Sequence, residues 1–119
     1  MNYDLEERTA KFGEAIIHFV ASLPKNEVNK ILINQVVRSA TSIGANYMEA
    51  NQASSKKDFR NKIGICRKEA NETKYWIRMI SSANHDKVAE CKNHWKEAHE
   101  LMLIFSKIFS SSSKKVETI

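Results

Sequence analysis

Apolar residues recur at alternating steps of four and three in four separate segments of the chain, the spacing of one face of an α-helix. In the second segment this stripe consists of Val36, Ala40, Ile43, Tyr47 and Ala50. In the third it consists of Phe59, Ile63, Cys66, Ala70, Thr73, Ile77 and Ile80. In the fourth it consists of Val88, Cys91, Trp95, Ala98, Met102, Phe105 and Phe109. The pattern predicts an all-α protein in which each helix turns one stripe toward a shared core.

Capping and breaking residues set the helix boundaries. Asp4 and Ser55 each have an acidic residue three positions later, as in a capping box, and Asp86 is a candidate N-cap. Pro24 ends the first helix because the residue before a proline is disfavoured in the α region. The predicted helices span residues 4–23, 27–53, 56–82 and 86–109. Their short connections favour an antiparallel up-down-up-down four-helix bundle over residues 1–109, followed by a flexible Ser/Lys-rich tail, 110–119.

The second segment carries a polar stripe of mostly small residues beside its apolar one, whereas a helix packed only in its own bundle needs a single apolar stripe. Small side chains allow close approach, and an aromatic anchor adds contact area. We therefore predict an oligomer interface formed by Ser39, Ser42, Asn46, Glu49 and Trp76. A carboxylate buried there needs a cationic partner, and Arg38 is the candidate for Glu49 or Glu69.

Length and composition place the chain among single-domain proteins. It has 119 residues with only three glycines and one proline. Its longest apolar run, Leu101 to Phe105, is far shorter than the roughly 20 residues of a membrane span. The polar, acidic opening does not resemble a secretory signal, and the two cysteines lie in helical patterns without a motif. We expect reduced core thiols, no membrane association and a cytoplasmic location.

The positive charge is concentrated in one segment. The net charge is +5, and residues 54–84 alone carry eight Lys or Arg against three acidic residues. An α-helix turns about 100° per residue, so five of these cations lie within about 40° of one line along the helix axis. The line borders the core face of the helix and is about 33 Å long. This basic ribbon consists of Lys56, Arg60, Arg67, Lys74 and Arg78. Charged residues usually form a solvated face, but solvated faces intersperse both signs, and this ribbon contains no acid. It is therefore a candidate nucleic-acid contact.

Other chemistries have weaker support. No histidine follows a glutamate by three positions, as a di-iron bundle site requires, and the Cys91-x-x-His94 pair with His99 lacks a fourth zinc ligand. We predict no metal, no cofactor and no catalytic residue. Arg78 and His85 have a spacing found in some helical-bundle ribonucleases, the HEPN class, but such a pair often arises by chance. No other set of nucleophile, base and orienting group is visible.

Several motifs resemble one bacterial family. They are Glu7-Arg8-Thr9, Leu23-Pro24, the run from Arg38 to Tyr47 with Glu49-Ala50, Ser55-Lys56-Lys57-Asp58-Phe59, and the run from Lys68 to Trp76. The chain resembles, over roughly residues 5–108, the four-helix-bundle proteins encoded in intervening sequences of 23S ribosomal RNA genes. Their relatives include the accessory variability protein of diversity-generating retroelements. The resemblance implies a homopentamer and, for the retroelement members, binding to nucleic acid and to a reverse transcriptase.

Three functional hypotheses follow. The first is a non-enzymatic oligomeric scaffold that binds RNA or DNA through the basic ribbon. The second is a protein-interaction module, for example a reverse-transcriptase accessory protein, that does not itself bind nucleic acid. The third and most remote is a small ribonuclease that uses Arg78 and His85.

Overall fold

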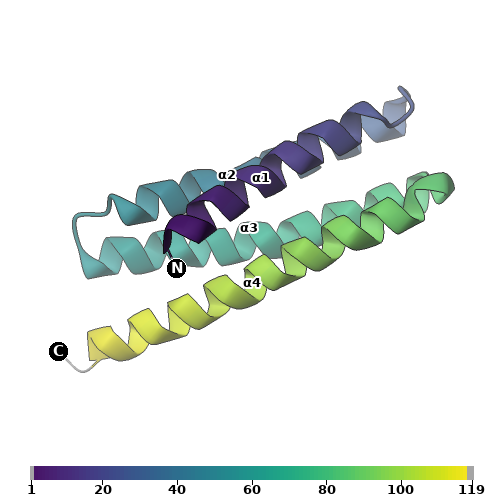
Figure 1. The fold of residues 1–119 in the computed structure, drawn as a ribbon. Helices are drawn as coiled ribbons and strands as arrows, with labels where there is room; N and C mark the ends of the chain where they lie inside the picture. The colour runs from purple at the N-terminus through teal and green to yellow at the C-terminus, as the bar shows by residue number, and fades with distance from the viewer. Residues whose placement is uncertain (1, 118–119) are drawn as a thin grey trace.

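The computed structural model describes residues 2–117, with side chains from residue 4 to residue 112. It contains four α-helices, α1 (Asn2–Ala21), α2 (Glu27–Asn51), α3 (Lys56–Ala83) and α4 (Val88–Glu117), and a 3₁₀ turn, η1 (His85–Lys87). Consecutive helices run in opposite directions (Figure 1). Helix α3 packs against both α2 and α4, and α1 packs mainly on α2. The structure confirms the predicted all-helical, antiparallel four-helix fold.

The core forms from the predicted stripes. The whole α2 stripe is buried, and so is the α3 stripe except for its first residue, Phe59, which is half-buried. Helix α1 contributes Leu5, Phe12, Ile16 and Phe19. The 3.6-residue period of each helix therefore determines which of its faces enters the bundle.

Both ends of helix α1 and the C-terminal end of α2 differ by two residues from the prediction. Helix α1 begins at Asn2 and ends at Ala21, so Asp4 lies inside its first turn rather than capping it. Ahead of Pro24 the chain tightens into a turn, in which the Leu23 N–H donates to the Val20 carbonyl at 3.2 Å. Helix α2 likewise ends at Asn51 with a similar tightened turn. The predicted Ser55 cap is confirmed, because Ser55 Oγ accepts a hydrogen bond from the Asp58 N–H at 3.0 Å.

Helix α4 differs most from the prediction. Asp86 does not cap it but lies within η1, whose preceding residue is Asn84. The helix also continues to Glu117, through most of the segment predicted to be a flexible tail. No glycine or proline follows Phe109, and serine and lysine tolerate helix, so nothing ends the helix there. Thr118 and Ile119 lie outside the described residues.

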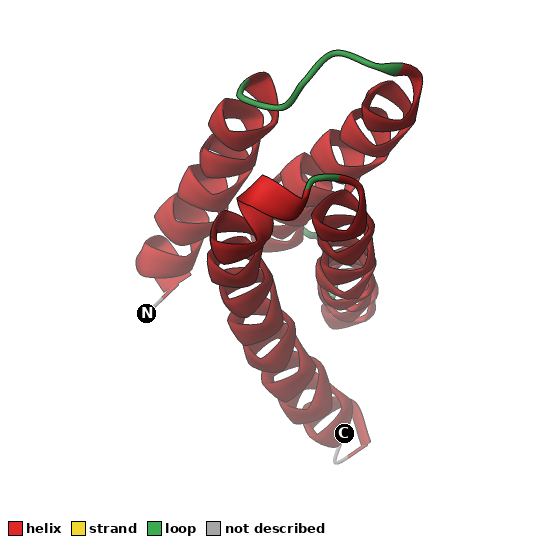
Figure 2. Cartoon of the chain, turned by 90° about the vertical axis from the view of Figure 1, so that its right-hand side faces the viewer, coloured by secondary structure: helices red, strands yellow, loops and turns green. Residues whose placement is uncertain are grey.

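One end of the bundle is held by a buried amide pair. Asn29 on α2 and Asn84 after α3 bond to each other in both directions, at 3.0 and 2.9 Å. Their remaining amide hydrogens reach the carbonyls of Pro24 and Ile80. Both side chains are almost fully buried, and this network satisfies both amide donors. The pair ties the connection between α1 and α2 to the end of α3. Figure 2 shows the α1–α2 and α3–α4 connections at the same end of the bundle.

None of the helices in the described part of the chain combines the length and the apolar character that a bilayer crossing requires.

Candidate nucleic-acid interface

The basic ribbon lies on the side of α3 that faces α4. Its end residues, Lys56 and Arg78, are exposed. The three cations between them, Arg60, Arg67 and Lys74, are half-buried because side chains of α4 pack against them. The ribbon therefore forms one wall of a seam between α3 and α4, and α4 supplies the other wall.

Phe109 of α4 supports two of the cations. The guanidinium carbons of Arg60 and Arg67 lie 3.8 and 4.2 Å from the centroid of its ring. Attraction between a cation and the negative face of an aromatic ring holds the guanidinium groups in place while leaving N–H groups at their edges for other acceptors. Arg60 Nε is not one of these groups, because it is buried; it has no hydrogen-bond partner among the described residues.

A second aromatic cluster lies farther along the seam. Lys74 Nζ is 3.0 Å from His99 Nδ1 and 4.9 Å from the centroid of the Trp95 ring. Because an ammonium group can only donate, Nδ1 accepts this hydrogen bond. The rings of Trp95 and His99 stack at 5.1 Å with an interplanar angle of 10°. Two aromatic residues and one cation thus form a packed group at the surface.

Sequence reasoning did not find this aromatic wall, because it assigned Trp95 and Phe109 to the core stripe of α4. Trp95 is in fact 37% exposed and Phe109 is half-buried. The buried face of α4 is centred on Ala98, Leu101 and Phe105, and Trp95 lies at its edge. Half-buried His94 instead lies beside Phe19, at 4.8 Å between ring centroids. The alternating spacing of three and four therefore identified the apolar side of α4 but not which of its residues are the most buried.

The cations of the ribbon have no ion pair with any described residue, whereas the flank of α3 toward α2 forms three ion pairs. There, Glu69 and Glu72 both pair with Arg38 of α2, the former at 3.3 Å, and Lys62 pairs with Glu49 of α2 at 2.8 Å. We call these five residues the paired flank. The sequence prediction that Arg38 partners Glu69 is thus consistent with the structure, while Glu49 has Lys62 as its partner.

The predicted oligomer interface lies along this flank, with one exception. Ser39 is completely buried inside the protomer, where its Oγ lies 2.8 Å from Thr73 Oγ1, so it cannot contribute to a subunit contact. The prediction of Ser39 is wrong because helical angle alone does not tell whether a neighbouring helix of the same protomer covers a polar position. Ser42 and Asn46 are half-buried and hydrogen-bonded to each other. Glu49 is exposed, and Trp76 is half-buried with its Nε1 donating to Glu72.

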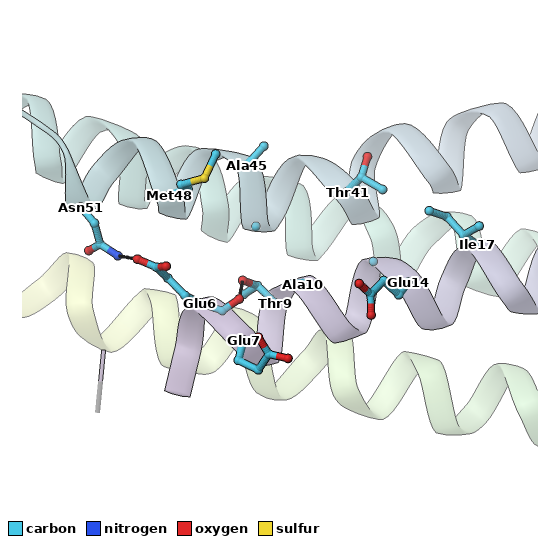
Figure 3. A pocket seen from close by; sticks show the side chains of 12 residues that line it. Glu6, Glu7, Thr9, Ala10, Glu14, Ile17, Thr41, Ala45, Met48 and Asn51 are labelled. Carbon is cyan, nitrogen blue, oxygen red and sulfur yellow. Dashed lines mark hydrogen bonds between the residues drawn. The ribbon is translucent and has the colours of Figure 1, made fainter. Parts of the chain in front are cut away.

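A large hollow lies elsewhere, between α1 and α2, and has a volume of about 820 Å³ (Figure 3). It is lined by small residues such as Gly13 and Ala45 and by the exposed side chains of Ile17 and Met48. The acidic residues on its rim are Glu6, Glu7 and Glu14. We call it the acidic groove. Its negative charge makes it unsuitable for a phosphate backbone.

The residues of the ribonuclease hypothesis, Arg78 and His85, are both exposed in the described part of the chain. No group of three or more His, Cys, Asp or Glu side chains in this part of the chain could hold a metal ion. Burial raises the pKa of the Cys66 thiol to about 12 and also raises that of Cys91. Neither thiol is therefore an activated nucleophile. Burial lowers the pKa of His94, which favours its neutral form.

Comparison with known proteins gives a family and a solved structure. The family model described as 23S rRNA-intervening sequence protein matches residues 1–107. The chain is also similar to a crystal structure from Bacteroides thetaiotaomicron VPI-5482, described as a protein with unknown function from the S23 ribosomal protein family. That similarity has 31% sequence identity and a TM-score of 0.79, and it covers 87% of this chain and 96% of the other. Comparison with curated proteins gives no match. The family-model match, which extends over almost the whole chain, shows that this protein belongs to the 23S rRNA-intervening sequence protein family.

Proposed function

We propose that this protein is a non-enzymatic, oligomeric scaffold that binds nucleic acid along the seam between α3 and α4. The observation that carries the proposal is the basic ribbon, whose five cations have no acidic partner in the described residues. Buried or half-buried cations without partners are costly, and a polyanion supplies the missing charge. The described part of the bundle is 52 Å in its longest dimension, so a ribbon along α3 can follow an extended phosphate backbone.

The form of the seam supports phosphate contacts rather than base reading along most of its length. Arg60 and Arg67 are oriented by Phe109, which leaves the edges of their guanidinium groups for phosphate oxygens. Such contacts position a nucleic acid without discriminating between sequences. We therefore expect broad sequence tolerance and a steep dependence of affinity on salt, because binding releases condensed counterions.

Charge reversal at the two ends of the ribbon tests this function. Lys56→Glu with Arg78→Glu changes only exposed side chains, so the fold should be unaffected. The double variant should bind RNA and DNA of every tested sequence more weakly. It should also have a slope of log K against log salt that is shallower by about 1.5, the value for two lost phosphate contacts.

A control variant with the same change in charge separates the effect of the ribbon surface on binding from the effect of the protein's net charge. Lys11→Glu with Lys25→Glu alters exposed lysines on α1 and on the loop after it, and α1 does not pack against α3. This variant should keep nearly the wild-type affinity and slope. Equal losses in the two double variants would show that net charge alone drives binding and would contradict the proposal.

Assembly is the second part of the proposal. The outer surface of α2 and α3 presents Ser42, Asn46, Glu49 and Trp76 beside Ile65, which is 37% exposed. Small polar side chains next to an aromatic and an aliphatic residue suit a subunit contact. A pentamer, which the sequence resemblance implies, would place several ribbons in one particle and multiply the phosphate contacts. Light scattering should give a mass several times the protomer mass of 13.7 kDa, and a monomer would contradict this part.

The acidic groove favours a second candidate function, a protein-interaction module. Ile17 and Met48 are 47% and 52% exposed, and the acidic rim suits a basic amphipathic segment of a partner protein. A reverse transcriptase is one such partner, given the resemblance to retroelement accessory proteins. If the wild type binds neither RNA nor DNA at low salt, this function replaces the first.

A further inference from the structure

Trp95 differs from every other aromatic residue in the described seam. Its ring is 37% exposed, is stacked on His99, and has the Lys74 ammonium 4.9 Å from its centroid. Phe109, by contrast, already has two guanidinium groups within 4.2 Å of its centroid. The neighbours of Trp95 fix the orientation of its ring, so stacking a further group on it costs little ordering entropy.

A hollow next to Trp95 has the chemistry of a nucleotide site. It has a volume of about 310 Å³, and Trp95, Ile77 and Cys91 give it apolar walls. Arg78 and Lys92 supply positive charge, and the hydroxyls of Ser81 and Ser82 also line it. A flat heteroaromatic ring with an attached phosphate suits this combination of a stacking surface, two cations and two hydroxyls.

We infer that Trp95 is a stacking platform for an unpaired base, which makes the protein a binder of single-stranded nucleic acid in preference to duplex. The inference rests on the proposed function and adds strandedness to it. Bases in a duplex stack on one another and cannot lie on a protein ring, whereas an unpaired base can. Phosphate contacts with the ribbon serve both forms, so the difference between them comes from Trp95. One stacked base is expected to strengthen binding between about fivefold and a hundredfold.

Intrinsic fluorescence provides the first test. Trp76→Phe leaves Trp95 as the sole tryptophan, and circular dichroism checks that the fold is retained. Titration with a short oligouridylate should quench the emission of Trp95. Titration with an RNA duplex of the same length should leave it nearly unchanged, even when binding is saturated. Binding of the oligouridylate without quenching would overturn the inference.

Affinity measurements provide the second test. Trp95→Ala should weaken oligouridylate binding about tenfold and leave duplex binding unchanged, while Trp95→Phe should retain most of the single-strand affinity. Tyr75→Ala is the matched control, because Tyr75 is a 54% exposed aromatic residue on α3 that contacts Trp76 rather than the seam. It should bind like the wild type.

The outcomes distinguish this inference from the proposed function. Equal losses for single strand and duplex in Trp95→Ala would refute the platform but leave the ribbon as a phosphate-binding surface. If the wild type binds neither form at low salt, the proposed function fails, and the inference fails with it.

Discussion

The two flanks of α3 carry charges that meet very different neighbours. On the flank toward α2, Glu69 and Glu72 both pair with Arg38, and Lys62 pairs with Glu49. On the flank toward α4, Arg60 and Arg67 lie over Phe109, and Lys74 bonds to His99. The same helix therefore has one flank whose charges form ion pairs with α2, where three carboxylates meet two cations, and one flank whose positive charge has no acidic partner among the described residues.

This difference indicates which surface is available to a polyanion. An ion pair between exposed side chains contributes little to stability, but it removes both charges from the long-range field of the protein. Aromatic neighbours orient a cation without neutralising it. We propose that the pairing of charged residues, more than their number, distinguishes a structural flank from a flank that can bind a polyanion.

The largest expected effect comes from disrupting the subunit contact proposed along the paired flank. Ser42→Arg introduces bulk and charge at a half-buried position where small side chains allow close approach. The mass from light scattering should fall to that of a protomer with helicity intact. Affinity for a long RNA should fall at least tenfold, because linked binding sites are lost. An assembly of unchanged mass would exclude this surface as the subunit contact.

The next effect comes from making the unpaired flank resemble the paired one. Asn71 is exposed and follows Arg67 by four positions and precedes Lys74 by three, so Asn71→Glu creates ion pairs along the ribbon. RNA affinity at low salt should fall roughly tenfold, as for the loss of one phosphate contact, and thermal stability should hardly change. Asn34→Glu, at an exposed position on α2, is the control and should have little effect. Similar losses in both would argue against a localised site.

The smallest effect comes from removing the central cation of the paired flank. Arg38→Met removes the cationic partner of Glu69 and Glu72, and of the two only Glu72 keeps a hydrogen bond from a described side chain, donated by Trp76 Nε1. The Glu69 side chain is only 14% exposed. The free energy of unfolding should fall by about 1 kcal/mol, the upper end for a partly exposed ion pair. The melting temperature should fall by about 3–6 °C. The salt slope of RNA binding should stay at the wild-type value, and a shallower slope would contradict the distinction between the flanks.

Much of this arrangement could be predicted from the sequence because it depends only on helical geometry. The 3.6-residue period identified the buried stripes of α2 and α3, and the same angles placed the basic ribbon beside the core rather than opposite it. The N-cap at Ser55 could be predicted because it is a hydrogen bond between residues only three positions apart in the sequence.

The rest depends on contacts between segments that are distant in the sequence. Whether Ser39 is exposed depends on Thr73 of α3, 34 residues away. Helix α4 turns His94 toward Phe19 and leaves Trp95 37% exposed, and this depends on how α4 is rotated against α1 and α3. From the sequence alone, either of these adjacent residues at the edge of the stripe could belong to the core. The buried pair of Asn29 and Asn84 has no local signal at all, since its partners are 55 residues apart.

Lysine acetylation of the wild type, with and without a saturating long RNA, tests the central claim most directly. Mass spectrometry gives the reaction rate of each lysine in the same sample, so no variant and no assumption about folding is needed. We expect RNA to slow the acetylation of Lys56 and Lys74 on the basic ribbon several-fold. Lys11 on α1 and Lys25 in the following loop should react at unchanged rates. Equal protection of all four lysines, or protection confined to Lys11 and Lys25, would contradict the assignment of the nucleic acid to the seam between α3 and α4.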